Sequence, residues 1–257
     1  MGAEKFMHIK AATSGKAPDC VVMNVTVRSM KLHGGAFGDR GGIRPDKTTL
    51  EAENVEATSL GAKTNLDRHI RNMASFGVPV VVSINRFASD TEAELNAISQ
   101  AARESGAQSV CITEVHANGG EGGKDLAEAV VKAVQNHVAA GRPFVPLFTP
   151  ETDVLEKATS IATRLYKAEG VDLTPKAVRE LDRIRTWGYG HLPVCMAKTQ
   201  YSFSHDASLL GAPSGFTVPV REFRLNAGAG FVVAVLGDMM TMPGLPKRPA
   251  ALDMDMD

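Results

Sequence analysis

The sequence predicts an α/β fold in which a largely parallel sheet is flanked by helices, followed by a smaller C-terminal extended region. Short segments rich in valine and isoleucine alternate with longer helical patterns, and most of these segments are continuously apolar. Such runs are typical of strands covered on both faces. The strand–helix–strand spacing predicts right-handed crossovers. Hydrophobic residues make up 44% of the 257 positions, which suffices for a core.

Strand and helix segments can be assigned in order along the chain. Strands are predicted at 20–27, 78–85, 109–115, 142–148 and 192–198. Helices are predicted at 65–76, 90–105, 123–140, 153–168 and 175–187. Thr64 is a candidate cap for the first helix and Ser89 or Asp90 for the second. Gly141 closes the third, and Pro175 suits a first helical turn.

The pattern divides the chain into three parts. Residues 1–150 carry the parallel α/β core, and 151–190 form a helical segment with no strand between its two helices. Residues 191–257 hold one late strand and a small extended region, which includes the proline-rich string MPGLPKRPAA. The acidic tail DMDMD is expected to fray.

Charge and cysteine usage exclude several classes of protein. A formal net charge of -1 gives no reason to expect nucleic acid or an anionic membrane as partner. No apolar run approaches the roughly 20 residues of a membrane-spanning helix. Cys20, Cys111 and Cys195 lie far apart in apolar runs, without metal-ligand spacing. We therefore expect buried, reduced cysteines, no metal site and a cytoplasmic protein.

Three loops follow predicted strands and are the first places to seek a ligand. They begin after Asn85, after Val115 and after Lys198. Ligands of open α/β sheets bind outside the carboxyl ends of the strands. Neighbouring parallel strands would bring these loops together around one crevice.

The second of these loops, HANGGEGG, contains four glycines and allows three interpretations. It could be a plain strand-to-helix turn, a ligand wall or a phosphate cradle. It matches neither the GxxxxGK[ST] nor the GxGxxG pattern, and Glu121 and Asp125 already place negative charge at that helix start. The chain contains no P-loop sequence anywhere.

Several long strings resemble one known family. They are GAEKFMHIK, NLDRHIRNMASFGVPVVVSINRFASDTEAEL, EVHANGGEGGKDLAEAV, LPVCMAKTQYSFSHD and VREFRLNAGAGFVVAVLGDMMTMPGLPKRPAA. Together they closely resemble formate–tetrahydrofolate ligase, also called 10-formyltetrahydrofolate synthetase. The resemblance covers the whole chain and corresponds to roughly the C-terminal half of that enzyme. The family has a P-loop NTPase-like fold, and its P-loop lies in the other half.

The resemblance implies an ATP-dependent ligation in one-carbon metabolism. Formate attacks the γ-phosphate of ATP, bound with magnesium, to give formyl phosphate, and N10 of tetrahydrofolate then takes the formyl group. The phosphate contacts and catalytic residues are expected in the other half, so this chain alone is predicted to be inactive. The family also implies a homo-oligomer and activation by a monovalent cation. No residue of this sequence can be assigned to the cation.

The resemblance assigns the folate side of the site to two aromatic positions and a glycine pair. Phe87 matches a phenylalanine that packs on one face of the pterin. His116 stands where the family has a tryptophan on the other face, which predicts weaker and pH-sensitive binding. Gly119 and Gly120 would let backbone approach the flat ring. The alternatives are a core phenylalanine and a histidine that satisfies a backbone carbonyl.

Two further pairs are candidates. Ser14 and Gly15 match a family turn near the nucleotide, although an ordinary turn before a strand fits equally. Lys198 and Thr199 lie at a strand end, where polar groups converge on ligands, but a solvent-facing lysine is the plainer interpretation.

Two other functions remain open at this stage. The chain could be a truncated, noncatalytic folate-binding or interaction module. It could also be one subunit of a split ligase, whose partner is an N-terminal chain bearing the P-loop.

Overall fold

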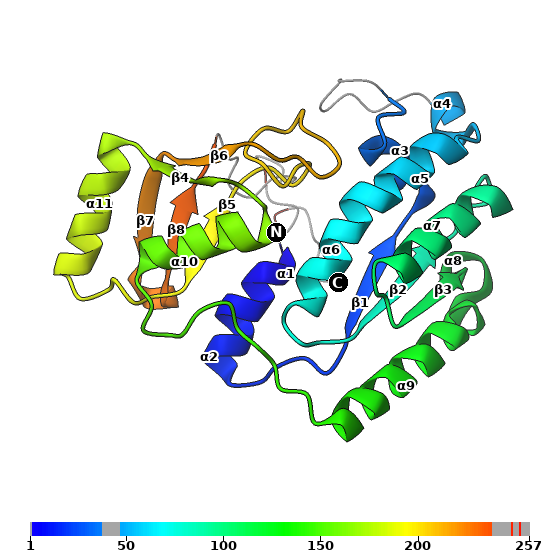
Figure 1. Cartoon of the computed structure of the whole chain (residues 1–257), viewed down its shortest axis with the longest axis horizontal. Coiled ribbons are helices and arrows are strands. Elements are labelled where there is room, and N and C mark those ends of the chain that lie inside the picture. The colour runs from blue at the N-terminus through cyan, green and yellow to red at the C-terminus, as the bar shows by residue number, and fades with distance from the viewer. Residues whose placement is uncertain (1, 38–46, 238–247, 249–251, 253–257) are drawn as a thin grey trace.

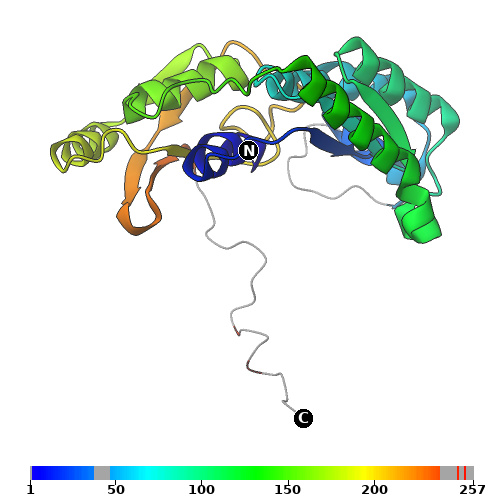
Figure 2. The ribbon, with the colours of Figure 1, turned by 90° about the horizontal axis from the view of Figure 1, so that it is seen from below.

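The computed structural model describes residues 2–37, 47–237, 248 and 252. Its elements form two sheet regions that lie side by side (Figure 1). The N-terminal helix lies between them, as the view from below shows (Figure 2). This helix runs without a break through α1 (Gly2–Lys5), a π-helical segment (Phe6–Ala11) and α2 (Ala12–Ser14). The proline-rich string and the acidic tail fall almost entirely outside the described residues.

The first region is a three-stranded parallel sheet in the order β1-β2-β3. Its strands are β1 (Val21–Val25), β2 (Val80–Asn85) and β3 (Ser109–Thr113). The helices of this region are α3 (Val27–His33), α4 (Lys47–Glu51), α5 (Val55–Gly61), α6 (Asp67–Ala74), α7 (Glu92–Glu104), α8 (Val115–Asn118) and α9 (Lys124–Ala140). The predicted parallel α/β core is therefore confirmed.

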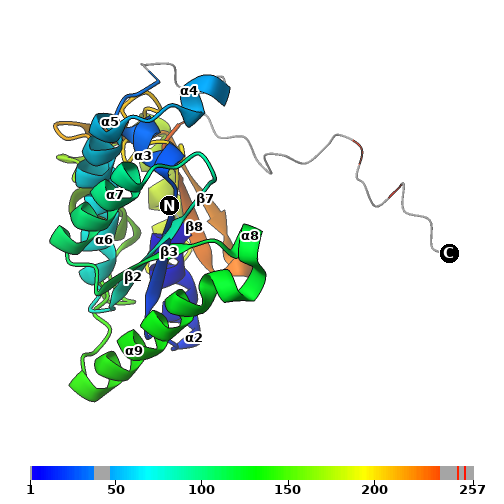
Figure 3. The ribbon, with the colours of Figure 1, turned by 90° about the vertical axis from the view of Figure 1, so that its right-hand side faces the viewer.

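Helices cover both faces of β2, which explains its continuously apolar sequence. The α5, α6 and α7 helices gather on one side of the strands (Figure 3). On the other face α9 packs against β2 and β3, and the Cys111 thiol lies 3.7 Å from the Asp125 carbonyl. All five residues Val80–Ile84 are buried as a result.

The second region contains two smaller sheets rather than a continuation of the first. One pairs β4 (Gly170–Leu173) with β6 (Thr217–Val220) in parallel. The other has the order β5-β8-β7, with β5 (Val194–Ala197) parallel and β7 (Glu222–Asn226) antiparallel to β8 (Phe231–Val235). The helices here are α10 (Val154–Ser160), extended by a π-helical segment (Ile161–Leu165), and α11 (Pro175–Thr186). One hydrophobic core joins residues of both regions.

One predicted strand is wrong, and one strand of the structure was not predicted. The segment 142–148 is not a strand, because Pro143 and Pro146 supply no backbone N–H for a ladder. It runs as irregular chain, with Val145 N–H donating to the Phe76 carbonyl at 2.9 Å. Conversely, β4 lies between the two helices of 151–190, where no strand was expected. The division of the chain into three parts stays a prediction.

Several predicted local features also differ. Thr64 caps no helix: it lies inside a continuous helix that begins at Val55, capped by Asn54. The cap of α7 is Thr91, in a reciprocal pair with Glu94, rather than Ser89 or Asp90. Pro175 at the start of α11 and Gly141 after α9 are confirmed. The three cysteines are free as expected, but they are half-buried rather than buried.

Candidate functional site

The carboxyl edge of the β1-β2-β3 sheet brings together the loops that carry Phe87 and His116. Phe87 follows β2 by two residues, and His116 follows β3 by three. Arg86 joins the two loops, because its N–H donates to the Thr113 carbonyl at 3.0 Å and its Nε lies 3.7 Å from Oε1 of Glu114. Two of the three predicted ligand loops therefore lie at one edge.

Phe87 is held in a tight turn and keeps part of its surface open. Its N–H donates to Oδ2 of Asp90 at 2.8 Å, and the Asp90 N–H donates back to the Phe87 carbonyl at 3.0 Å. Burial raises the pKa of the Asp90 carboxyl, although the bond from Phe87 acts in the opposite sense. The Phe87 side chain is 36% exposed, and the Arg28 guanidinium lies 4.3 Å from its ring centroid.

A buried ion pair lies behind this turn. Lys31 Nζ is 2.7 Å from Oε1 of Glu94, and the two side chains are 1% and 0% exposed. Glu94 also accepts from the backbone N–H groups of Asn54 and Thr91, at 2.8 and 3.2 Å. Burial raises the pKa of Glu94, but these bonds outweigh that effect and hold it below its usual value. The pair thereby fixes α3, the loop before α5 and the start of α7 to one another.

The glycine loop is a strand-to-helix turn packed against its own chain. Gly119 has φ +56°, which favours glycine. At Gly122 a Cβ would lie 2.5 Å from the Glu114 carbonyl oxygen, so the close approach occurs there. A Cβ on Gly119 or Gly120 would meet nothing within 4 Å. His116 is exposed on α8 beside them, so these positions border open space rather than a closed pocket wall.

Lys198 and Thr199 do not join this edge, contrary to the expectation of one crevice. They follow β5, which belongs to a different sheet. Lys198 is 2% exposed rather than solvent-facing. Its ammonium donates to the carbonyls of Ser202 and Thr199 and lies 5.0 Å from the Tyr166 ring. Burial lowers the pKa of Lys198 to about 8, with a smaller effect from nearby Lys5.

Ser14 and Gly15 end the N-terminal helix, before β1 begins. Gly15 has φ +67° and terminates the helix, while Ser14 Oγ lies 3.4 Å from the Ala11 carbonyl. Since this turn leads into the amino end of β1, it lies away from the edge that carries Phe87 and His116. The sequence suggested that Ser14 and Gly15, like Phe87 and His116, lie beside a substrate. It did not show that the two pairs lie at opposite ends of the strands.

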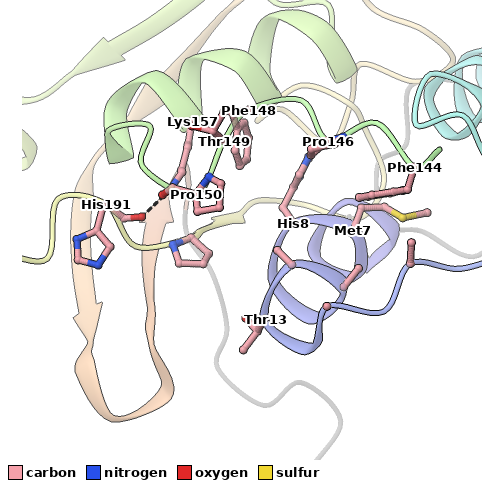
Figure 4. Close-up of a pocket in the computed structure, with 15 residues that line it drawn as sticks. Met7, His8, Thr13, Phe144, Pro146, Phe148, Thr149, Pro150, Lys157 and His191 are labelled. Atoms are coloured by element: carbon pink, nitrogen blue, oxygen red, sulfur yellow. Dashed lines mark hydrogen bonds between the residues drawn. The ribbon is translucent and has the colours of Figure 1, made fainter.

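Gly15 lines an apolar cavity of about 420 Å³ between the N-terminal helix, the 144–150 segment and Pro193 (Figure 4). Lys157 is buried on its wall, and its Nζ donates to the carbonyls of Pro150 and His191 at 2.7 and 2.5 Å. Burial lowers the pKa of this lysine. His8 is 2% exposed, and no described residue accepts from or donates to its ring nitrogens. Neither Phe87 nor His116 lines this cavity.

Sequence reasoning missed Arg28, Lys31 and Glu94. All three lie within ten residues of the carboxyl end of β1 or β2. The rule that directs attention to strand ends could have found Arg28, three residues after β1, had the first strand been examined like the others.

The sequence model of the family described as formate–tetrahydrofolate ligase matches residues 1–257. The chain belongs to the formate–tetrahydrofolate ligase family. This confirms the resemblance that the long sequence strings indicated.

Three curated formate–tetrahydrofolate ligases show how far the similarity reaches. The protein of Paracoccus denitrificans is 49% identical over 257 residues, which cover 100% of this chain and 44% of the relative. That of Ruegeria sp. is 49% identical over 251 residues, covering 98% and 42%. That of Acidiphilium cryptum is 45% identical over 257 residues, covering 100% and 44%. The chain thus spans less than half the length of these family members.

The described helices are all too short or too polar to span a lipid bilayer. Within the described ranges, no three or more histidine, cysteine, aspartate or glutamate side chains gather in a way that could hold a metal ion.

Proposed function

We propose that this chain is the folate-binding part of an ATP-dependent ligase that joins formate to tetrahydrofolate, giving 10-formyltetrahydrofolate through formyl phosphate. The observation that carries the proposal is the placement of Phe87 and His116 on neighbouring loops at one sheet edge, in a member of this family. A partly exposed phenyl ring and an exposed imidazole there offer two faces for a flat pterin.

Each group in the proposed site has a defined part. Phe87 stacks on one face of the pterin, and its turn is fixed by Asp90, so little ordering is needed on binding. His116 lies against the other face, and its ring is smaller than the tryptophan of the family. Gly119 and Gly120 have open space above them, which lets backbone approach the ligand edge.

Few residues of this chain are candidates for contact with the nucleotide. The proposed nearness of Ser14 and Gly15 to the ATP requires the nucleotide to reach from their turn, before β1, toward the opposite edge that carries Phe87. The sequence contains no P-loop to hold the phosphates or magnesium. We therefore propose that this chain alone does not turn over ATP. A P-loop-bearing polypeptide would supply that step, in a cytoplasmic homo-oligomer with formate as the third substrate.

The decisive experiment is calorimetric titration of tetrahydrofolate into this chain at pH 7.5. We expect saturable one-site binding that weakens at least about fivefold in Phe87→Ala, since aromatic stacking contributes about 1–3 kcal/mol. Phe6→Ala is the matched control, because Phe6 is also partly exposed but lies on the N-terminal helix. Equal affinity of the unaltered chain and Phe87→Ala, or no binding by a folded chain, would overturn the proposal.

A further inference from the structure

Arg28 contacts the Phe87 ring, and the function proposed above gives this arginine no role. Arg28 lies in the first turn of α3, three residues beyond the end of β1. Because β1 and β2 are parallel neighbours, their following segments meet at one edge. The guanidinium carbon lies 4.3 Å from the centroid of the Phe87 ring, which places the cation over the ring.

The guanidinium is fixed there in spite of an unsatisfied donor. Its Nη2 lies 3.6 Å from Oε1 of Glu51, and the two side chains are 31% and 35% exposed. The buried Nε–H has no acceptor among the described residues. Buried donors without partners are uncommon and unfavourable, so the contact with the Phe87 ring must compensate for the missing acceptor.

A phenyl ring has two faces, and a cation on one of them alters the other. The guanidinium attracts the negative charge of the ring face, so the opposite face becomes less electron-rich. Such a face stacks more favourably on an electron-rich heterocycle than on an electron-poor one. The reduced ring of tetrahydrofolate carries electron-donating amino nitrogens, whereas the fully oxidised pterin of folic acid is electron-poor.

We propose that Arg28 is a specificity-determining residue, which through Phe87 makes this edge prefer reduced over oxidised pterins. The inference rests on the proposed function, since it assumes that a pterin stacks on Phe87. Arg28 acts through the ring rather than by touching the ligand. A purely structural role for Arg28 would weaken the binding of both pterins equally.

The test compares two ligands in the full 257-residue chain. Dissociation constants for tetrahydrofolate and folic acid are measured anaerobically by calorimetry, and their ratio gives the redox preference. We expect Arg28→Met, which keeps a long side chain but removes the charge, to lower that preference by no more than the two- to fivefold to which an exposed cation–π contact of about 0.5–1 kcal/mol corresponds. Arg28→Lys should retain most of it.

Arg68→Met is the matched control, since the Arg68 guanidinium lies 5.4 Å from the Phe203 ring in another part of the molecule. It should leave the ratio unchanged. An unchanged ratio in Arg28→Met, with both affinities lowered equally or not at all, overturns the inference while the proposed function stands. If the unaltered, folded chain binds neither pterin, the proposed function fails and this inference falls with it.

Discussion

The two sheet regions bury lysine side chains in different ways. Behind the Phe87 turn, Lys31 is 1% exposed and faces the carboxylate of Glu94. In the second region Lys157 and Lys198 are equally buried, at 1% and 2%, but within the described part of the chain their ammonium groups donate to backbone carbonyls alone. The first arrangement pairs opposite charges, and the second surrounds a charge with dipoles.

The two arrangements stabilise a buried ammonium group to different extents. A carboxylate neutralises an ammonium, so the pair can be held rigidly by further backbone donors, as Glu94 is. Carbonyl dipoles stabilise an ammonium less well, and burial accordingly lowers the pKa of both Lys157 and Lys198. The proposed pterin site thus rests on a fixed charge pair, whereas the second region contains lysines that are easier to deprotonate.

The largest effect is expected when the charge pair is broken. Glu94→Gln leaves the Lys31 ammonium buried without its counter-charge, which should lower the free energy of unfolding by about 3–5 kcal/mol. Chemical denaturation measures this. Asp67→Asn is the control: it breaks the surface pair with Arg71 and should cost less than about 1 kcal/mol. The pair would be dispensable if both variants lost the same amount.

A smaller loss is expected from Lys157→Met. The substitution fills a similar volume but leaves the carbonyls of Pro150 and His191 without their donor. We expect the free energy of unfolding to fall by about 1–3 kcal/mol, less than for Glu94→Gln. Lys132→Met, on the exposed side of α9, should change it little. A more stable Lys157→Met protein would show that the carbonyls do not compensate for burial of the ammonium.

The smallest effect depends on pH. Because the folded-state pKa of Lys198 is about 8 and an unfolded lysine titrates near 10.4, the unfolded state binds more protons between these values. Stability should therefore rise by about 1–2 kcal/mol from pH 8 to 9.5, and the burial penalty is fully present below pH 8. Lys198→Met should flatten this slope. Denaturation of both proteins at the two pH values decides it, and an identical rise in both contradicts the assignment.

Sequence reasoning succeeded where local chemistry decides the structure. The apolar runs at 78–85 and 109–115 became β2 and β3; helices bury β2 on both faces, whereas β3 at the edge is half-buried and leaves Ile112 exposed. It failed at 142–148, where apolar composition suggested a strand although two prolines remove the ladder donors. It also missed β4, a four-residue strand that exists only through pairing with β6, 47 positions further along in register.

The candidate site divides in the same way. The family resemblance assigned Phe87 and His116, and the pattern predicted the strands that they follow; their role in folate binding stays a prediction. Arg28 and the Lys31–Glu94 pair could not be recognised as partners, because their contacts join segments of the chain 59 and 63 positions apart. The inclusion of Lys198 in the same crevice was wrong, since sequence cannot show that β5 belongs to another sheet.

The sequence by itself determined the family, the alternation of strands and helices, and the absence of a P-loop from these 257 residues. These properties are written in consecutive residues and need no knowledge of distant contacts. Only the tertiary structure decided which strands share a sheet, which lysine meets a carboxylate, and that a guanidinium covers Phe87. The physical reason is that charge pairing and stacking act over a few ångströms, between segments that only folding brings together.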